Sequence, residues 1–482
     1  MLITSNITDK FSPAACAMAV GETTFSERND NAVYSRLMTV ASEYDPEVHG
    51  GKRLECYLIF KNQLSLWLLQ TVGVPEDVHR KVDVFATTVP DLMAKTLFVQ
   101  LPSAVFRFPP LDRKPISRDS GTTVHLVVAG NGAMAEAAVM NAALVAHYPN
   151  YCRDHRLRTR ITLVDDEVTA FRDGLLHRYS NLFDHSYYRS LDLNEENPRC
   201  VCHAPEYRDV REDFVDVEWE FVNGNLQNAA LRQKLSEWAC SGTQQLTVMV
   251  CHADQQRNLT EALSLPEQVY RVEIPVLCHA EESDMLEVAK RDSLYATVLP
   301  FGSWMCRVET LRMLKELAKR VNYVYNHCFS LEAGAPVSAP SDIDRKVADR
   351  LWAEVPSLPK QYSNIFNAMT LGTKMHSLGH DASDWNTYYA VSMNEVDLLT
   401  EVEHNRWNVE ELILGYRPVT DEEQKLVEQD IALKRKFRDR KVHYDLRAFS
   451  DLREDGTGKN VNVYDRVLTQ GIPLIIKSCI TN

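Results

Sequence analysis

The stretch that decides the fold is VHLVVAGNGAMAEAAVMNAALVAH at residues 124–147, followed by RITLVDDE at 160–167. Each stretch begins with a short continuous apolar run, which is typical of a strand buried on both faces of a parallel sheet. Helical periodicity from Ala135 to His147 predicts a helix between them. Similar apolar runs recur at 219–224, 246–252, 274–279 and 296–302. This alternation predicts an α/β fold with a doubly wound, Rossmann-type parallel sheet over residues 122–330.

A glycine turn of the GxGxxA type follows the first predicted strand and opens the helix. The first glycine permits a tight turn, and the second lets a pyrophosphate approach the backbone near the positive end of the helix. Asp165 ends the next predicted strand, where an acidic side chain accepts bonds from ribose hydroxyls, although it follows Gly132 by 33 residues rather than about 20. The alternative is a purely structural turn. The turn residues expected at the nucleotide are Gly130, Asn131, Gly132, Ala133 and Met134.

Further residues at predicted strand ends extend this candidate site. Cys251 and His252 end the run at 246–252 and are expected to line the crevice; buried residues without a ligand are the alternative. Adjacent strand residues point to opposite faces, so they form no ready-made Cys–His dyad. The run Cys200–His203 is predicted as a loop with two thiols, because a zinc site needs four ligands. The run Gly456–Lys459 is predicted as a turn, and no residue is assigned a catalytic or metal-binding role.

The rest of the chain divides around this central domain. Residues 1–52 are weakly periodic and are predicted to be a mostly helical or irregular N-terminal segment. Residues 53–115 predict an α/β unit that lacks a glycine motif, with a proline-containing linker at its end. A second stretch with proline and serine at 333–342 marks a boundary within a helical linker at 331–385. A mostly helical domain is predicted for residues 386–482.

Two parts of the chain resemble a known combination of domains. The quoted stretches resemble the Rossmann domain of potassium-transport regulators (TrkA-N type), as it occurs in prokaryotic proteins that also carry a ryanodine-receptor repeat (RyR) domain. The run LLTEVEHNRWNVEELILGY at 398–416 resembles the opening helix of that RyR domain, and 441–446 resembles its second signature. Tyr416 stands where the family usually has tryptophan. The resemblance implies a ligand pocket in the RyR-like domain with contributions from Glu403, His404, Arg406, Trp407, Tyr416, His443, Tyr464 and Asp465.

The residues themselves permit two interpretations of this second region. Trp407 and the tyrosines could stack on a base, while Arg406 with His404 or His443 could hold a phosphate. Alternatively, Trp407 is a core residue, and Glu403 and Arg406, three positions apart on one helix, form a structural ion pair.

Composition narrows the function classes. Lys and Arg number 53 against 67 Asp and Glu, and the net charge of −14 disfavours nucleic acid as the main partner. Eleven cysteines without paired spacing favour a reducing cytoplasm. Asn131, Glu136 and Asn141 interrupt the longest apolar stretch, so no transmembrane segment is expected.

These observations predict a cytoplasmic, homo-oligomeric regulatory or sensor protein for a nucleotide-type ligand, with NAD(H) or a related adenine nucleotide as the candidates. The resemblance implies a prokaryotic signalling or antiviral defence setting and a separate effector or channel protein as the partner. An NAD(P)-dependent oxidoreductase is the alternative function, and a purely structural assembly protein is a third.

Overall fold

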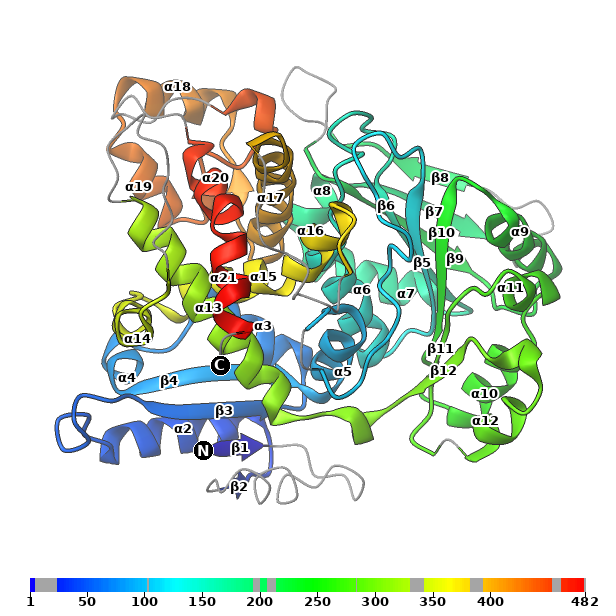
Figure 1. The fold of residues 1–482 in the computed structure, drawn as a ribbon, viewed down its shortest axis with the longest axis horizontal. Helices are drawn as coiled ribbons and strands as arrows, with labels where there is room; N and C mark the ends of the chain where they lie inside the picture. The colour runs from blue at the N-terminus through cyan, green and yellow to red at the C-terminus, as the bar shows by residue number, and fades with distance from the viewer. Residues whose placement is uncertain are drawn as a thin grey trace.

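The computed structural model describes residues 1–4, 24–101, 104–193, 200–205, 214–282, 284–329, 342–381, 393–452 and 461–480. In these ranges the chain forms a four-stranded parallel sheet, an eight-stranded mostly parallel sheet and a largely helical C-terminal region (Figure 1). The α/β class with parallel sheets and the helical C-terminal region predicted from the sequence are confirmed. The turn predicted at Gly456–Lys459 and nearly all of the boundary at 333–342 lie outside the described residues.

The first sheet has the strand order β2-β1-β3-β4, and all its pairs are parallel. Strands β3 and β4 lie within residues 53–115, for which the sequence predicts an α/β unit, and both are rich in apolar residues. Strand β1 contributes only three residues, too few to produce a pattern, and it lies in the segment predicted as mostly helical or irregular. The elements of this unit are β1 (Leu2–Thr4), β2 (Thr24–Ser26), α2 (Asp30–Glu43), β3 (Leu54–Phe60), α3 (Gln63–Val72), α4 (Glu76–Lys81), β4 (Val82–Thr88) and α5 (Val89–Phe98).

The second sheet has the order β12-β11-β10-β5-β6-β9-β7-β8. Strand β5 (Thr123–Ala129) lies in the middle, with β6 (Thr159–Asp165) on one side and β10 (Gln244–Val250) on the other, so the direction of winding reverses between β5 and β10. The remaining strands are β7 (Tyr187–Asp192), β8 (Cys200–His203), β9 (Val217–Asn223), β11 (Val276–His279) and β12 (Val298–Phe301). The helices between them are α6 (Ala133–Val145), α7 (Val168–Arg178), α8 (Ser180–Asp184), α9 (Ala229–Cys240), α10 (Gln255–Leu263), α11 (Glu267–Arg271) and α12 (Asp284–Ala289).

The six strands predicted for this domain are all present, but the prediction for Cys200–His203 is wrong. Instead of a loop, this run forms the edge strand β8, which pairs antiparallel with β7. Its residues Cys200, Val201 and Cys202 are all exposed. Because CVCH is short and largely exposed, it lacks the apolar run by which the central strands are recognised.

The C-terminal region is formed mainly by helices that pack on one another. Helix α13 (Val308–Phe329) leaves the large sheet and contacts α14 (Arg345–Ala353) and α15 (Leu358–Met369), as the lime helix in Figure 1 shows. The helical linker predicted at 331–385 contains, in its described part, α14, α15 and α16 (Leu371–Ser377). The other elements are α17 (Met393–Ile413), β13 (Arg417–Pro418), α18 (Asp421–Gln429), α19 (Leu433–Arg438), β14 (Val442–His443), α20 (Val463–Gln470) and α21 (Ile472–Ile480).

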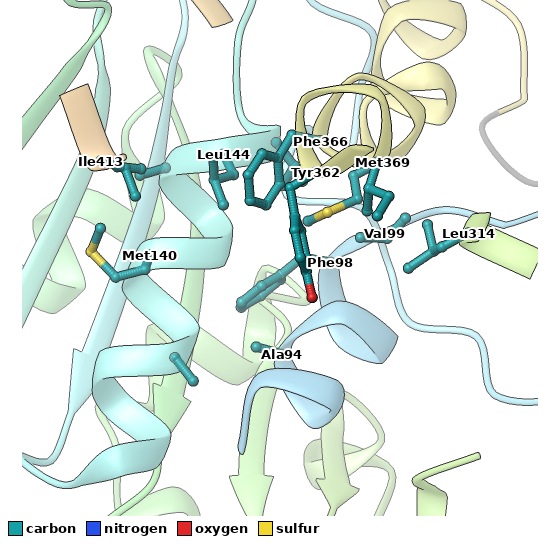
Figure 2. Packing of buried hydrophobic residues seen from close by; sticks show 14 of the residues in the cluster. Ala94, Phe98, Val99, Met140, Leu144, Leu314, Tyr362, Phe366, Met369 and Ile413 are labelled. Atoms are coloured by element: carbon teal, nitrogen blue, oxygen red, sulfur yellow. The ribbon is translucent and has the colours of Figure 1, made fainter. Parts of the chain in front are cut away.

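One apolar core joins all three parts of the chain. Helix α6 is buried at every position from Met134 to Val145, because it lies between the large sheet and the helices α5, α15 and α17. Figure 2 shows Tyr362 and Phe366 of α15 packed between α5 and α6. The other labelled side chains there are Ala94, Phe98, Val99, Met140, Leu144, Leu314, Met369 and Ile413. The three parts therefore share this core, while the large sheet and the helical region each also have a smaller cluster of their own.

Polar contacts also fasten the first sheet to the helical region. The indole N–H of Trp352 on α14 donates to Asp83 Oδ1 in β4 at 3.0 Å, and His79 Nε2 lies 2.8 Å from the carbonyl of Val355. The indole of Trp67 on α3 donates to the carbonyl of Ile413 at the end of α17, at 2.9 Å. Within the described ranges, no helix has both the length and the apolar character needed to cross a bilayer.

Candidate functional site

The glycine turn connects β5 to α6 at the point where the sheet reverses its winding. Gly130 has φ +135°, and a Cβ there would lie 2.9 Å from the carbonyl oxygen of Cys251, so neither the backbone conformation nor the space admits a side chain. Gly132 is the N-cap residue of α6 and, as a glycine, has no side chain that could cap the helix. A Cβ added to Gly132 would have no atom within 4 Å. The first glycine is thus required by the fold, while the second leaves open space at the helix N-terminus.

The other turn residues take different positions around this opening. Asn131 and Ala133 are exposed and flank Gly132, whereas Met134 is buried in the core beneath the turn. The first turn of α6 also carries Glu136, whose carboxylate pairs with Arg178 and accepts a bond from the Tyr179 hydroxyl at 3.1 Å. Because Arg178 balances this carboxylate, the positive end of the helix remains suited to an anion.

Asp165 lies at the carboxyl end of β6, beside the turn, as predicted. Its Oδ1 accepts hydrogen bonds from Asn131 Nδ2 and from the backbone N–H of Glu167, each at 2.9 Å. Although burial favours the neutral acid, bonds from His252 and from the Glu167 N–H hold the pKa of Asp165 below its ordinary value. Asp165 is therefore an anionic acceptor that already has protein partners.

His252 follows β10 and lies between two carboxylates. Its Nδ1 is 3.4 Å from Asp165 Oδ2, and its Nε2 is 2.9 Å from Glu261 Oε2 on α10. Burial opposes a charge on the ring, but the bonds to Asp165 and Glu261 outweigh it and raise the pKa of His252. Arg257 Nε binds the other oxygen of Glu261 at 2.7 Å. The neighbouring Cys251 belongs to the apolar core instead, and burial raises the pKa of its thiol.

A second polar group lies at the same edge of the sheet, formed by Glu281 and Ser303, which sequence reasoning missed, and by His279, which ends the predicted strand at 274–279. Glu281, just after β11, accepts from the Ser303 hydroxyl at 2.6 Å and lies 3.3 Å from His279 Nε2. Burial opposes ionisation, but the bonds from His279 and Ser303 lower the pKa of Glu281 to about 2. The carboxylate lies between the hydroxyl and the imidazole, so the ring does not act as a base toward Ser303. His279 ends β11, Glu281 follows β11 and Ser303 follows β12, and these positions at strand ends were the available signal.

Glu403 and Arg406, predicted as ligand residues of the RyR-like region, are fully buried on α17 and bind each other. Arg406 Nη2 lies 2.8 Å from Glu403 Oε1, so the structural ion pair considered from the sequence is present. Glu403 also pairs with Lys374, and Arg406 with Glu410. Burial alone would raise the pKa of Glu403, but Arg406 and Lys374 lower it to about 2. A ligand at these two residues would have to displace existing partners.

The predicted aromatic residues of this region do come together. The rings of Trp407 and His443 meet edge to face with centroids 4.9 Å apart, and the ring of Tyr416 is 6.0 Å from His443. His404 Nδ1 binds Asp465 Oδ2 at 3.0 Å and fixes the ring beside Trp407. Burial lowers the pKa of His443 to about 3, so this ring is neutral.

Tyr464 lies away from that cluster and stacks on Tyr325 of α13, with centroids 6.4 Å apart. The structure therefore brings together four aromatic or imidazole rings of the predicted set, half-buried at Trp407 and Tyr416, but places Tyr464 against another helix. Among the described residues there is no group of three His, Cys, Asp or Glu side chains arranged to hold a metal ion.

Comparisons with known proteins found no matching family model, no matching curated protein and no matching solved structure. The resemblance to TrkA-N and RyR domains rests on the quoted residues alone.

Proposed function

We propose that the chain is a regulatory protein that senses a nucleotide-type ligand, NAD(H) or a related adenine nucleotide, at the turn between β5 and α6. The strand order supports this proposal. Numbered from β5, the strands β9-β6-β5-β10-β11-β12 follow the order 3-2-1-4-5-6 of doubly wound Rossmann-type sheets, in which ligands bind outside the carboxyl ends of the strands where the order reverses.

The observation that carries the proposal is the pairing of Gly130 and Gly132 at this reversal. Gly130 lets β10 approach closely, and Gly132 leaves the N-terminus of α6 open to a phosphate. Asp165 at the next strand end is the acceptor for ribose hydroxyls, once the side chain of Asn131 turns away from it. Because Asn131 is exposed, this rearrangement needs no change in the core.

The binding of a ligand, rather than its turnover, is the proposed mechanism. The polar groups at the strand ends are held in pairs that join neighbouring loops: Asp165 with His252, and Glu281 with Ser303. A ligand that hydrogen-bonds to Asp165 weakens the contact of Asp165 with His252. This alters the contact between His252 and Glu261, so the effect of binding extends to α10. Such a ligand shifts the protein by its difference in affinity for the two arrangements. The prokaryotic cytoplasmic defence or signalling setting, the separate effector or channel, and the sensor role of the RyR-like region are extensions of the resemblance.

The test is a thermal-shift series with NAD, NADH, ADP-ribose and ATP on the wild type and three variants. A ligand at about 100 times its Kd adds roughly 2.7 kcal/mol to the state that binds it. Gly132→Trp fills the open space and should abolish the shift. Gly242→Trp is the matched control, because that glycine also has no neighbour within 4 Å and precedes β10 at the opposite edge of the sheet.

The Trp407→Ala variant distinguishes binding at the glycine turn from binding in the RyR-like region. A shift that survives Trp407→Ala and Gly242→Trp but is lost in Gly132→Trp supports binding at the turn. An equal shift in Gly132→Trp, or no shift with any nucleotide, contradicts the proposal. If the thermal shift is lost only in Trp407→Ala, the ligand binds in the RyR-like region instead. Steady consumption of NADH would instead support the oxidoreductase.

A further inference from the structure

A cavity of about 420 Å³ lies away from the glycine turn, where the segment that joins the two sheets passes the end of α16. Its size falls in the range of small-molecule sites, roughly 300–1,000 Å³. Gln100 at the end of α5 and Arg107, Phe108 and Arg113 of the connecting segment form one side, and His376 and Asp381 form the other.

The charge of this cavity is opposite to that of the chain. Among the described residues of its lining are two arginines, the histidines His376 and His380, and the acidic Asp381, although the chain carries a net charge of −14. The carboxyl edge of the large sheet, in contrast, presents carboxylates after β6 and β11. The described lining of the cavity is therefore suited to an anion.

His376 is fixed so that one ring nitrogen remains for a ligand. Its Nδ1 lies 2.8 Å from Oδ2 of Asp112, a carboxylate that is 1 % exposed. Nε2 has no hydrogen-bond partner among the described residues. Burial disfavours the charged ring, but the bond to Asp112 outweighs it and raises the pKa of His376. In its charged form the ring presents an N–H donor that suits an anion.

Arg113 carries a charge that the described residues do not balance. Its Nη1 donates to the carbonyl of Glu273 at 3.3 Å, while its Nε is shielded from solvent and has no hydrogen-bond partner in the part of the chain that is described. Burial lowers the pKa of Arg113, and no carboxylate of the described residues counters this effect. A half-buried guanidinium in this state gains stability from an anion that accepts its bonds.

We propose that this cavity is a second ligand site, which binds the phosphate groups of a nucleoside phosphate through Arg107, Arg113 and His376. Arginine forks match phosphate oxygens in a bidentate manner, and the half-buried ring of Phe108 offers a face on which the base stacks. The bound molecule contacts both the segment that joins the sheets and the end of α16. It therefore stabilises the docking of the helical region on the two sheets.

The test measures the affinity of ADP, pyrophosphate, inorganic phosphate and adenosine for the full chain by calorimetry. All chains carry Gly132→Trp, so binding at the glycine turn does not contribute and the two proposals fail separately. ADP should bind saturably, pyrophosphate should compete with it, and adenosine should bind far more weakly. Pyrophosphate binding without ADP binding would overturn the role of Phe108 and of the base.

Arg113→Gln and Arg107→Gln should each weaken ADP binding by about tenfold or more, since each removes a charge-assisted bond of roughly 1.5–3 kcal/mol. Arg107 is exposed, so its variant keeps the fold even if Arg113→Gln does not. Arg80→Gln on α4 is the matched control, an exposed arginine whose ion pair within the described part of the chain is with Glu76, and should leave the affinity unchanged. Undiminished binding in both cavity variants, or no saturable ADP binding, would overturn the proposal.

The pH dependence gives an independent readout. Affinity should fall as the pH rises through the range in which His376 loses its proton, because the charged ring is the donor. His376→Gln should remove this dependence while Arg80→Gln retains it. An identical pH profile in His376→Gln would remove His376 from the site.

Discussion

The hydroxyl of Tyr362 satisfies both backbone polar groups of Ala86. It donates to the Ala86 carbonyl at 2.9 Å and accepts from the Ala86 N–H at 2.8 Å. Ala86 lies in β4, the edge strand of the first sheet, and Tyr362 reaches it from α15, with its hydroxyl visible in Figure 2. An edge strand otherwise leaves such groups without partners. At this position one side chain replaces a neighbouring strand.

Tyr362→Phe should lower the free energy of unfolding by about 2–4 kcal/mol, because it keeps the ring packed but leaves two buried backbone groups without a partner. Urea unfolding measures the loss of stability, and faster amide hydrogen exchange at Ala86 would show that the loss arises at this contact. Tyr34→Phe is the control: its half-buried hydroxyl has no partner among the described residues, so a change within about 0.5 kcal/mol is expected. Equal effects of the two substitutions would contradict the role of Tyr362.

The two glycines of the turn should respond differently to alanine. Gly130→Ala places a Cβ 2.9 Å from the Cys251 carbonyl at φ +135°, and we expect a loss of about 2–4 kcal/mol. Gly132→Ala meets no atom within 4 Å and should cost about 1 kcal/mol or less, as a change of N-cap residue. Thermal and urea unfolding compare the two. A larger loss in Gly132→Ala would show that the turn is packed differently.

Glu411 should make stability depend on pH. Burial, and then the charge of Glu410, raise the pKa of Glu411 from 4.5 to about 8. Between these values the folded chain holds a proton that the unfolded chain has released, so the free energy of unfolding falls as pH rises, by up to about 1.4 kcal/mol per pH unit.

Glu411→Gln removes this titration and should flatten the dependence of stability on pH between these values. Glu422→Gln, an exposed carboxylate on α18, should keep the wild-type slope. Urea unfolding at a series of pH values measures both. The same slope in Glu411→Gln as in the wild type would show that Glu411 is ionised in the folded chain.

Arg406 holds two carboxylates inside the helical region. Arg406→Met leaves Glu403 and Glu410 buried without that partner and should cost about 3–5 kcal/mol. Arg417→Met breaks an ion pair with Glu423 whose arginine side chain is 40 % exposed, and should cost about 1 kcal/mol or less. Urea unfolding compares them. A small loss in Arg406→Met would mean that water reaches the cluster.

The central strands could be predicted from the sequence because they are buried on both faces. The sequences of β4, β5 and β10 are mostly apolar, and their alternation with helices indicates a parallel arrangement. Strands β7 and β8 were missed because their residues are half exposed and mixed in character. A strand such as β1, three residues long, becomes stable only through its neighbours and leaves no periodic signal.

The candidate site was predictable in position but not in detail. Parallel strands end at one edge, so Gly130, Gly132 and Asp165 were expected together. The contact between Asp165 and His252 joins residues far apart in the sequence, and it depends on side-chain directions that periodicity does not encode. One of the two partners of Glu403 could be predicted: Arg406 lies one helical turn away on the same helix. The other partner, Lys374, comes from another helix and could not.

The helices that cover the edge of the first sheet have a consequence for synthesis of the chain. Ala86 and Tyr362 are 276 residues apart, and Asp83 and Trp352 are 269 apart. At roughly 5–20 residues per second, a ribosome needs about 15–55 s to add that length. During this interval strand β4 has no cover, and nascent chains that stop before α14 expose an open strand edge to one another. Translation rate and chaperone supply should therefore govern the yield of this protein more than its final stability does.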